Sequence, residues 1–61
     1  MIRIHDTYVS LSNIKKIYYN RIADNSYMYI EYQFDDQPVR LEVGSFDEYI
    51  MFADEIVEAL K

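Results

Sequence analysis

The sequence predicts an α+β fold, in which an antiparallel meander of three to four strands packs against one C-terminal amphipathic helix. Three observations predict it. Apolar and polar residues alternate over 27–34 and over 39–43, which is the period of half-buried strands. Apolar residues over 46–60 recur instead at helical spacing. A chain of 61 residues can bury both apolar faces only if the helix lies across the sheet.

We expect a single small domain, 1–61, with a thin core, because short chains bury a smaller share of their surface than long ones. The chain has no cysteine, so neither disulfides nor thiolate metal sites can stabilise it. Self-association is a common alternative support for small domains. We therefore expect a homo-oligomer, and a homodimer in particular.

Two short strands are expected near the N-terminus, over about 1–5 and 8–10. Isoleucines alternate with polar residues in the first of them, and His5-Asp6-Thr7 turns the chain into the second. Leu11-Ser12-Asn13 is expected to form a brief turn, because Ser and Asn side chains bond the nearby backbone.

The third strand is expected over about 14–22, which is rich in β-branched and aromatic residues. A turn at Ala23-Asp24-Asn25-Ser26 then pairs it with a fourth strand over about 27–34. The register stays open at this point. Two inward pairs fit the pattern, Ile17 with Tyr19 or Tyr18 with Ile22.

The fourth strand and a fifth over about 39–43 form a predicted hairpin across Asp35-Asp36-Gln37-Pro38, which is made of turn formers. Alternation assigns the even-numbered residues of the fourth strand and the odd-numbered residues of the fifth to the core. The predicted inward set is Met28, Ile30, Tyr32, Phe34, Val39, Leu41 and Val43.

A helix is expected over about 46–60. Gly44 breaks the preceding strand, and the Ser45-Phe46-Asp47-Glu48 stretch has the spacing of a capping box. In such a box the Ser45 hydroxyl accepts the backbone N–H of Glu48, and the Glu48 side chain reaches back. The predicted buried stripe is Phe46, Tyr49, Ile50, Ala53, Ile56, Val57 and Leu60.

No motif for catalysis, a cofactor or a metal is present. The one histidine, His5, has no nucleophile-elbow pattern near it, so we interpret it as a surface or turn residue. Only carboxylates are numerous enough to bind a metal, and Asp35 and Asp36 are explained by their turn. The single Gly44 excludes a glycine-rich phosphate loop. We expect a protein that is not an enzyme and needs no cofactor.

The net charge of −5 is uneven, with −1 over residues 1–43 and −4 over residues 44–61. Such acidity repels nucleic acid and attracts basic protein surfaces. The longest apolar runs are two or three residues, so neither a signal-peptide core nor a membrane span is predicted. We expect a cytoplasmic protein without a membrane partner.

The preferred function is a small, non-catalytic protein-binding module that occupies the basic surface of a partner. Met51 points away from the predicted buried stripe and Phe52 lies at its edge, so both are candidate anchors. An acidic helix face is ordinarily just solvated, but here it can also imitate nucleic-acid phosphates. The expected partner-binding set is Glu48, Met51, Phe52, Asp54, Glu55 and Glu58.

The short, acidic chain, rich in Tyr, Ile and Asn, is similar to small phage or prophage proteins of low-GC bacteria. The similarity is one of composition and covers the whole chain. Members of that loose class are often non-enzymatic inhibitors that block a host or defence protein by surface contact. The resemblance implies an inhibitor of a nucleic-acid-handling protein, acting in the host cytoplasm.

The alternative is a single-stranded nucleic-acid-binding domain with a tyrosine-rich sheet face. Bases stack on aromatic rings while cations follow the phosphates. The residues of this face are Lys15, Lys16, Tyr18, Tyr27, Tyr29 and Arg40. The order of four strands and a helix resembles single-stranded DNA-binding domains of transcriptional coactivators, in topology only. Cross-strand tyrosine pairs that stabilise a small sheet are the simpler interpretation, and the negative charge opposes nucleic acid.

Overall fold

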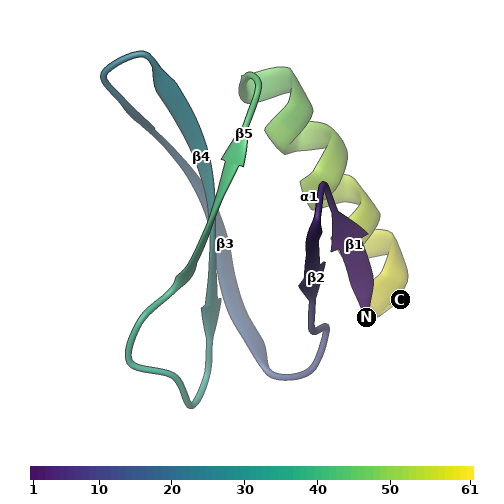
Figure 1. Cartoon of the computed structure of the whole chain (residues 1–61). Coiled ribbons are helices and arrows are strands. Elements are labelled where there is room, and N and C mark those ends of the chain that lie inside the picture. The colour runs from purple at the N-terminus through teal and green to yellow at the C-terminus, as the bar shows by residue number, and fades with distance from the viewer.

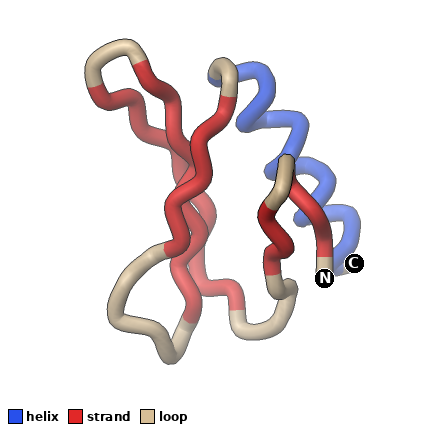
Figure 2. Tube along the Cα trace, viewed as in Figure 1, coloured by secondary structure: helices blue, strands red, loops and turns tan.

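The computed structural model describes all residues, Met1–Lys61. Its elements are β1 (Ile2–Ile4), β2 (Thr7–Val9), β3 (Ile14–Ile22), β4 (Asn25–Tyr32), β5 (Val39–Val43) and α1 (Phe46–Leu60). The strands form two antiparallel sheets, a β1-β2 pair and a three-stranded sheet in the order β3-β4-β5. Figures 1 and 2 show one helix beside these sheets. The predicted α+β class, with a meander and a C-terminal helix, is confirmed.

The N-terminal hairpin does not extend the meander. β1 and β2 pair only with each other, and the chain then passes through a turn at Ser12-Asn13 into β3. Asn13 adopts a left-handed φ of 65°, which Asn tolerates better than most residues. Two bonds attach this turn to the end of β4. The Tyr32 hydroxyl donates to the Ser10 carbonyl at 2.6 Å, and the Gln33 N–H donates to the Asn13 carbonyl at 2.8 Å.

The β3-β4 pairing resolves the register that the sequence left open. Ile17 lies opposite Ile30 and Tyr19 opposite Met28, so this pair faces the core. Tyr18 lies on the outer face instead. Ile14, which pairs with Tyr32, also packs against the core, because a bulge between Ile14 and Lys16 inserts one extra residue and reverses the alternation.

β4 begins and ends two residues earlier than its predicted range, whereas β3, β5 and α1 have the ranges that the sequence predicts. Ala23 takes a left-handed φ of 54°, and the two residues Ala23-Asp24 form the whole turn in place of the four that the sequence predicts. Asn25 therefore already belongs to β4 and pairs with Ile22. At the other end the ladder stops at Tyr32. The prediction that Phe34 faces the core is wrong, because Phe34 lies in the following turn with 77% of its surface exposed.

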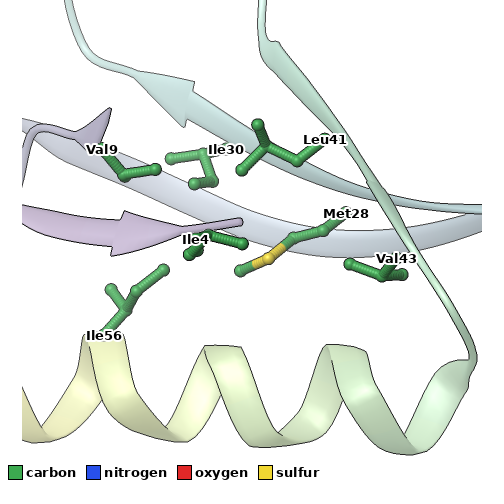
Figure 3. Packing of buried hydrophobic residues seen from close by; sticks show 7 residues of the cluster. All are labelled: Ile4, Val9, Met28, Ile30, Leu41, Val43 and Ile56. Atoms are coloured by element: carbon green, nitrogen blue, oxygen red, sulfur yellow. The ribbon is translucent and has the colours of Figure 1, made fainter. Parts of the chain in front are cut away.

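The core lies between the inner face of the three-stranded sheet and the layer formed by α1 and the β1-β2 hairpin (Figure 3). Every strand except β3 contributes at least one buried side chain to it, and α1 contributes one. Seven residues are buried: Ile4, Val9, Met28, Ile30, Leu41, Val43 and Ile56. Their side chains converge in Figure 3, with Ile4 of the hairpin between the helix and the sheet.

α1 buries less than its sequence predicts. Ile56 is its one buried residue, and Tyr49, Phe52 and Ala53 pack partly against the core. The other four members of the predicted buried stripe are between 41% and 52% exposed: Phe46, Ile50, Val57 and Leu60. The prediction that they are buried is wrong, because the small sheet and the hairpin cover only one side of the helix. α1, the one helix, lacks the length and apolar content that crossing a membrane requires.

Candidate functional site

The N-terminus of α1 is capped as the sequence predicts, with one difference. Ser45 is extended and its Oγ accepts the backbone N–H of Glu48 at 3.2 Å. The Glu48 side chain reaches back one residue further than a standard capping box, since its Oε1 accepts the N–H of Gly44 at 3.1 Å. A Cβ on residue 44 would lie 3.1 Å from Glu48 Oε2, so glycine favours this close approach.

Glu48 also holds the N-terminal hairpin. His5, the residue of the β1-β2 turn with a φ of 53°, places its Nε2 2.9 Å from Glu48 Oε1. The His5 ring meets Phe52 edge-on at 5.4 Å between centroids. The N–H of Gly44, and then the bond to His5, hold the pKa of Glu48 below its usual value. Glu48 and Phe52 therefore serve the fold, and we remove both from the expected partner-binding set.

A groove of about 500 Å³ lies between the β1-β2 turn and β5. Asp6, Glu42 and Glu48 make it acidic, and the His5–Glu48 pair lies at its wall. Thr7 is the one hydroxyl-bearing side chain that lines it, and no group of carboxylates and histidine in the chain is arranged to hold a metal ion. The groove has a base but no activated nucleophile beside it.

The remaining members of the expected set do come together on α1. Met51, Asp54, Glu55 and Glu58 are all exposed, and their i, i+3, i+4, i+7 spacing puts them on one side of the helix. We call these four residues the acidic face. Glu58 accepts a bond from Lys61 Nζ at 3.1 Å, but both side chains are largely exposed, so this pair neutralises the face only weakly.

A second exposed strip of α1 was missed by the sequence reasoning. Phe46, Ile50, Ala53, Val57 and Leu60 follow one another at intervals of four, three, four and three residues. We call these five residues the apolar seam. All five residues belong to the stripe that the sequence analysis predicts to be buried. Helical periodicity identifies an apolar strip, but it does not tell whether another part of the protein covers that strip.

The tyrosine face forms on the outer side of the sheet. Tyr18 and Tyr29 stack across β3 and β4 with centroids 4.9 Å apart and planes 3° from parallel. Lys16 Nζ lies 5.1 Å from the centre of the Tyr18 ring, and the Arg40 guanidinium 4.8 Å from that of Tyr27. These ring faces are thus engaged within the protein, the geometry expected of pairs that stabilise a sheet.

Lys15 and Tyr18, two members of the predicted nucleic-acid-binding set, lie in different surroundings. Lys15 is exposed as the extra residue of the β3 bulge, outside the ladder that carries the other residues. Desolvation, and then the negative charge of Glu31, raise the pKa of the Tyr18 hydroxyl. That hydroxyl therefore stays protonated at neutral pH and adds no charge to the face.

The comparison with known proteins gives no match among family models, curated proteins or solved structures.

Proposed function

We propose that this protein is a small, non-catalytic protein-binding module that docks on a basic surface of a partner through the acidic face of α1. The observation that carries the proposal is the grouping of Met51 with Asp54, Glu55 and Glu58 on one exposed side of the helix. Ile56, the buried residue of α1, lies roughly opposite on the helical wheel, so the acidic face points away from the core.

The composition of the acidic face suits a protein partner. Met51 is 52% exposed, and a flexible methionine adapts its shape to an apolar pocket. The three carboxylates around it would orient the encounter and select a basic surface. An apolar centre within a polar rim is the common arrangement of protein interfaces.

The sharper form of the proposal is an inhibitor of a nucleic-acid-handling protein. Carboxylates spaced along a helix can replace phosphates in a basic groove, because both present negative oxygen atoms to Lys and Arg. The compositional similarity to small phage proteins supports this class of partner, and we propose that the protein acts in the host cytoplasm. A site for catalysis is not proposed, because the Thr7 hydroxyl, which lines the same groove, makes no hydrogen bond to the His5–Glu48 pair.

The test is capture of partners from a bacterial lysate with wild-type protein and two variants of equal charge change. Glu55→Lys/Glu58→Lys reverses the acidic face, while Asp35→Lys/Asp36→Lys reverses two exposed carboxylates of the β4-β5 turn. We expect a partner that wild type and the turn variant retain and the helix variant loses. Equal capture by all three proteins, or equal loss from both variants, would contradict the assignment of the helix.

A second candidate is single-stranded nucleic-acid binding by the tyrosine face. It is favoured by three half-buried tyrosines that share an open sheet face with Lys16 and Arg40. Against it stand the net charge of −5 and the prior engagement of the ring faces. We therefore rank it below the protein-binding module.

A further inference from the structure

The apolar seam holds the largest group of exposed large apolar side chains on one element, although the Phe46 ring also meets the Tyr19 ring edge-on at 5.0 Å between centroids. Phe46, Ile50, Val57 and Leu60 make up four of the chain's nine exposed large hydrophobic residues, and all four lie on one strip of α1. Ala53, which is half-buried and packs partly against the core, lies at the centre of the strip. Isolated exposed apolar residues are normal, but a continuous strip marks an interaction surface.

The spacing of the seam specifies what kind of element covers it. Alternate intervals of three and four residues are the heptad pattern of a helix that packs along another helix. Ile50 and Val57 fall at one of the two apolar heptad positions, and Phe46, Ala53 and Leu60 fall at the other. The spacing of the seam therefore fits a second helix that packs along α1.

We infer that this helix is α1 of a second copy of the chain, which packs antiparallel so that Ala53 of each copy lies at a two-fold axis. The seam is nearly symmetric about Ala53, since Phe46 and Leu60 are each seven residues away. An interface between identical copies requires such self-complementarity. The small alanine at the centre lets the two helices approach closely.

Charge supports the antiparallel direction. Along one flank of the seam, Asp47 lies at the N-terminal end of α1, Asp54 lies beside the central Ala53, and Lys61 follows the C-terminal end. Two Asp47–Lys61 pairs in the antiparallel dimer offset the repulsion between the two Asp54 carboxylates near the axis. An antiparallel pair brings Lys61 of each copy to the end where Asp47 of the other lies. The two helix dipoles then point in opposite directions, so ends of opposite partial charge lie side by side. A parallel pair would bring like ends together and would give Asp47 no Lys61 of the other copy nearby.

The inferred dimer needs little ordering. α1 is already capped and packed on its own sheet, so its helical conformation is present before association. A helix of this length alone would be marginal, and the 61-residue chain has only seven buried residues. Covering the seam adds the apolar burial that the small core lacks.

The centres of the seam and of the acidic face lie roughly 130° apart around the helix, and Asp54 lies at the border between them. The dimer does not rest on the proposed function, since it can be measured without any partner. If both hold, the dimer presents two acidic faces at once, and binding to a partner with two basic sites gains from the raised effective concentration.

The first test is the solution mass of the purified protein across concentration, by sedimentation and light scattering. Wild type is expected to reach twice the 7.4 kDa mass of the chain. Ile50→Glu/Val57→Glu is expected to weaken the dimer by at least about hundredfold, because two apolar contacts are lost from each copy. Met51→Glu, on the acidic face, is the matched control and is expected to remain dimeric.

The second test determines whether the two α1 helices run parallel or antiparallel, and it does not depend on variants that disrupt the dimer. The chain has no cysteine, so Phe46→Cys and Leu60→Cys proteins can be mixed and oxidised. An antiparallel dimer gives the mixed disulfide, while a parallel dimer gives disulfides within each variant. Wild type that stays monomeric up to about millimolar concentration, a dimer that Met51→Glu disrupts equally, or disulfides within each variant alone would overturn the inference.

Discussion

The Nε2 of His5 lies 2.9 Å from the Oε1 of Glu48, and this contact joins the β1-β2 turn to the first turn of α1. The two residues are 43 positions apart in the sequence. Because Glu48 Oε1 also accepts the N–H of Gly44, one carboxylate oxygen connects the hairpin, the end of β5 and the helix. The N-terminal hairpin is thereby attached to the element that carries both exposed surfaces.

Acid should weaken this junction. The pKa of Glu48 is held below its usual value of 4.5, chiefly by the Gly44 N–H and then by His5. A carboxyl with a depressed pKa in the folded state stabilises the fold fully above its unfolded pKa. That contribution is lost as the pH falls through the lower, folded value.

Thermal unfolding of wild type and Glu48→Gln between pH 3 and pH 7 measures this contribution. Wild type should have the higher melting temperature near neutral pH, and the difference should shrink on acidification below about pH 4.5. Glu55→Gln is the control, because Glu55 is exposed on the same helix. A difference for Glu48→Gln that stays constant across this pH range would contradict the assigned role.

Removal of the helix cap should destabilise the protein measurably. Ser45→Ala deletes the hydroxyl that accepts the Glu48 N–H at 3.2 Å, and such a loss typically costs about 1 kcal/mol. Ser45→Asp restores an acceptor and should recover most of the loss. Urea unfolding of wild type and the two variants measures these differences in the free energy of unfolding. A Ser45→Ala protein as stable as wild type would show that the cap is dispensable.

The tyrosine stack should be detectable as a coupling energy. A double-mutant cycle of Tyr18→Ala and Tyr29→Ala, measured by chemical unfolding, should give about 0.5–1.5 kcal/mol, because the two rings stack closely. A coupling near zero would mean that the rings do not support the sheet. Tyr8, which is exposed on the separate hairpin, supplies a control cycle of Tyr8→Ala with Tyr29→Ala.

The same face separates the two candidate functions. We expect no binding of a labelled oligothymidine at low salt, because the net charge is −5 and the cations lie over the protein's own rings. Fluorescence anisotropy measures this directly. Salt-sensitive binding that Tyr29→Ala abolishes, in a protein that remains folded, would instead favour the nucleic-acid candidate.

Two neighbouring residues of α1 should differ sharply in their contribution to stability. Ile56 is fully buried, so Ile56→Val should cost about 0.5–1.5 kcal/mol. Val57 is exposed on the seam, so Val57→Ala should change the stability of the monomer less. Urea unfolding at low protein concentration makes the comparison. Equal losses would show that α1 packs in a different rotation.

Much of the fold could be predicted because the relevant signals are local. The alternation over 39–43 and the helical period over 46–60 predict β5 and α1 with the observed ranges. The serine and glutamate at capping-box spacing predict the cap. Phe34 was misplaced because alternation continues beyond Tyr32 in the sequence, while the ladder of β4 ends there.

The candidate surfaces could be predicted only in part. Met51, Asp54, Glu55 and Glu58 were identified correctly as neighbours, because residues three and four apart on a helix share one side. Glu48 and Phe52 were not recognised as partners of His5, because that contact connects positions far apart in the chain. No local pattern carries information about such a pairing.

The sequence by itself determined the α+β class, the meander, the capped helix and the concentration of acid near the C-terminus. Only the tertiary structure decided which part of the apolar stripe of α1 is buried against the sheet and the hairpin. The period of a helix specifies an apolar strip, but the amount buried depends on the width of the sheet and hairpin that pack against it. In this chain they cover Ile56 and leave Ile50 and Val57 exposed, which creates the seam.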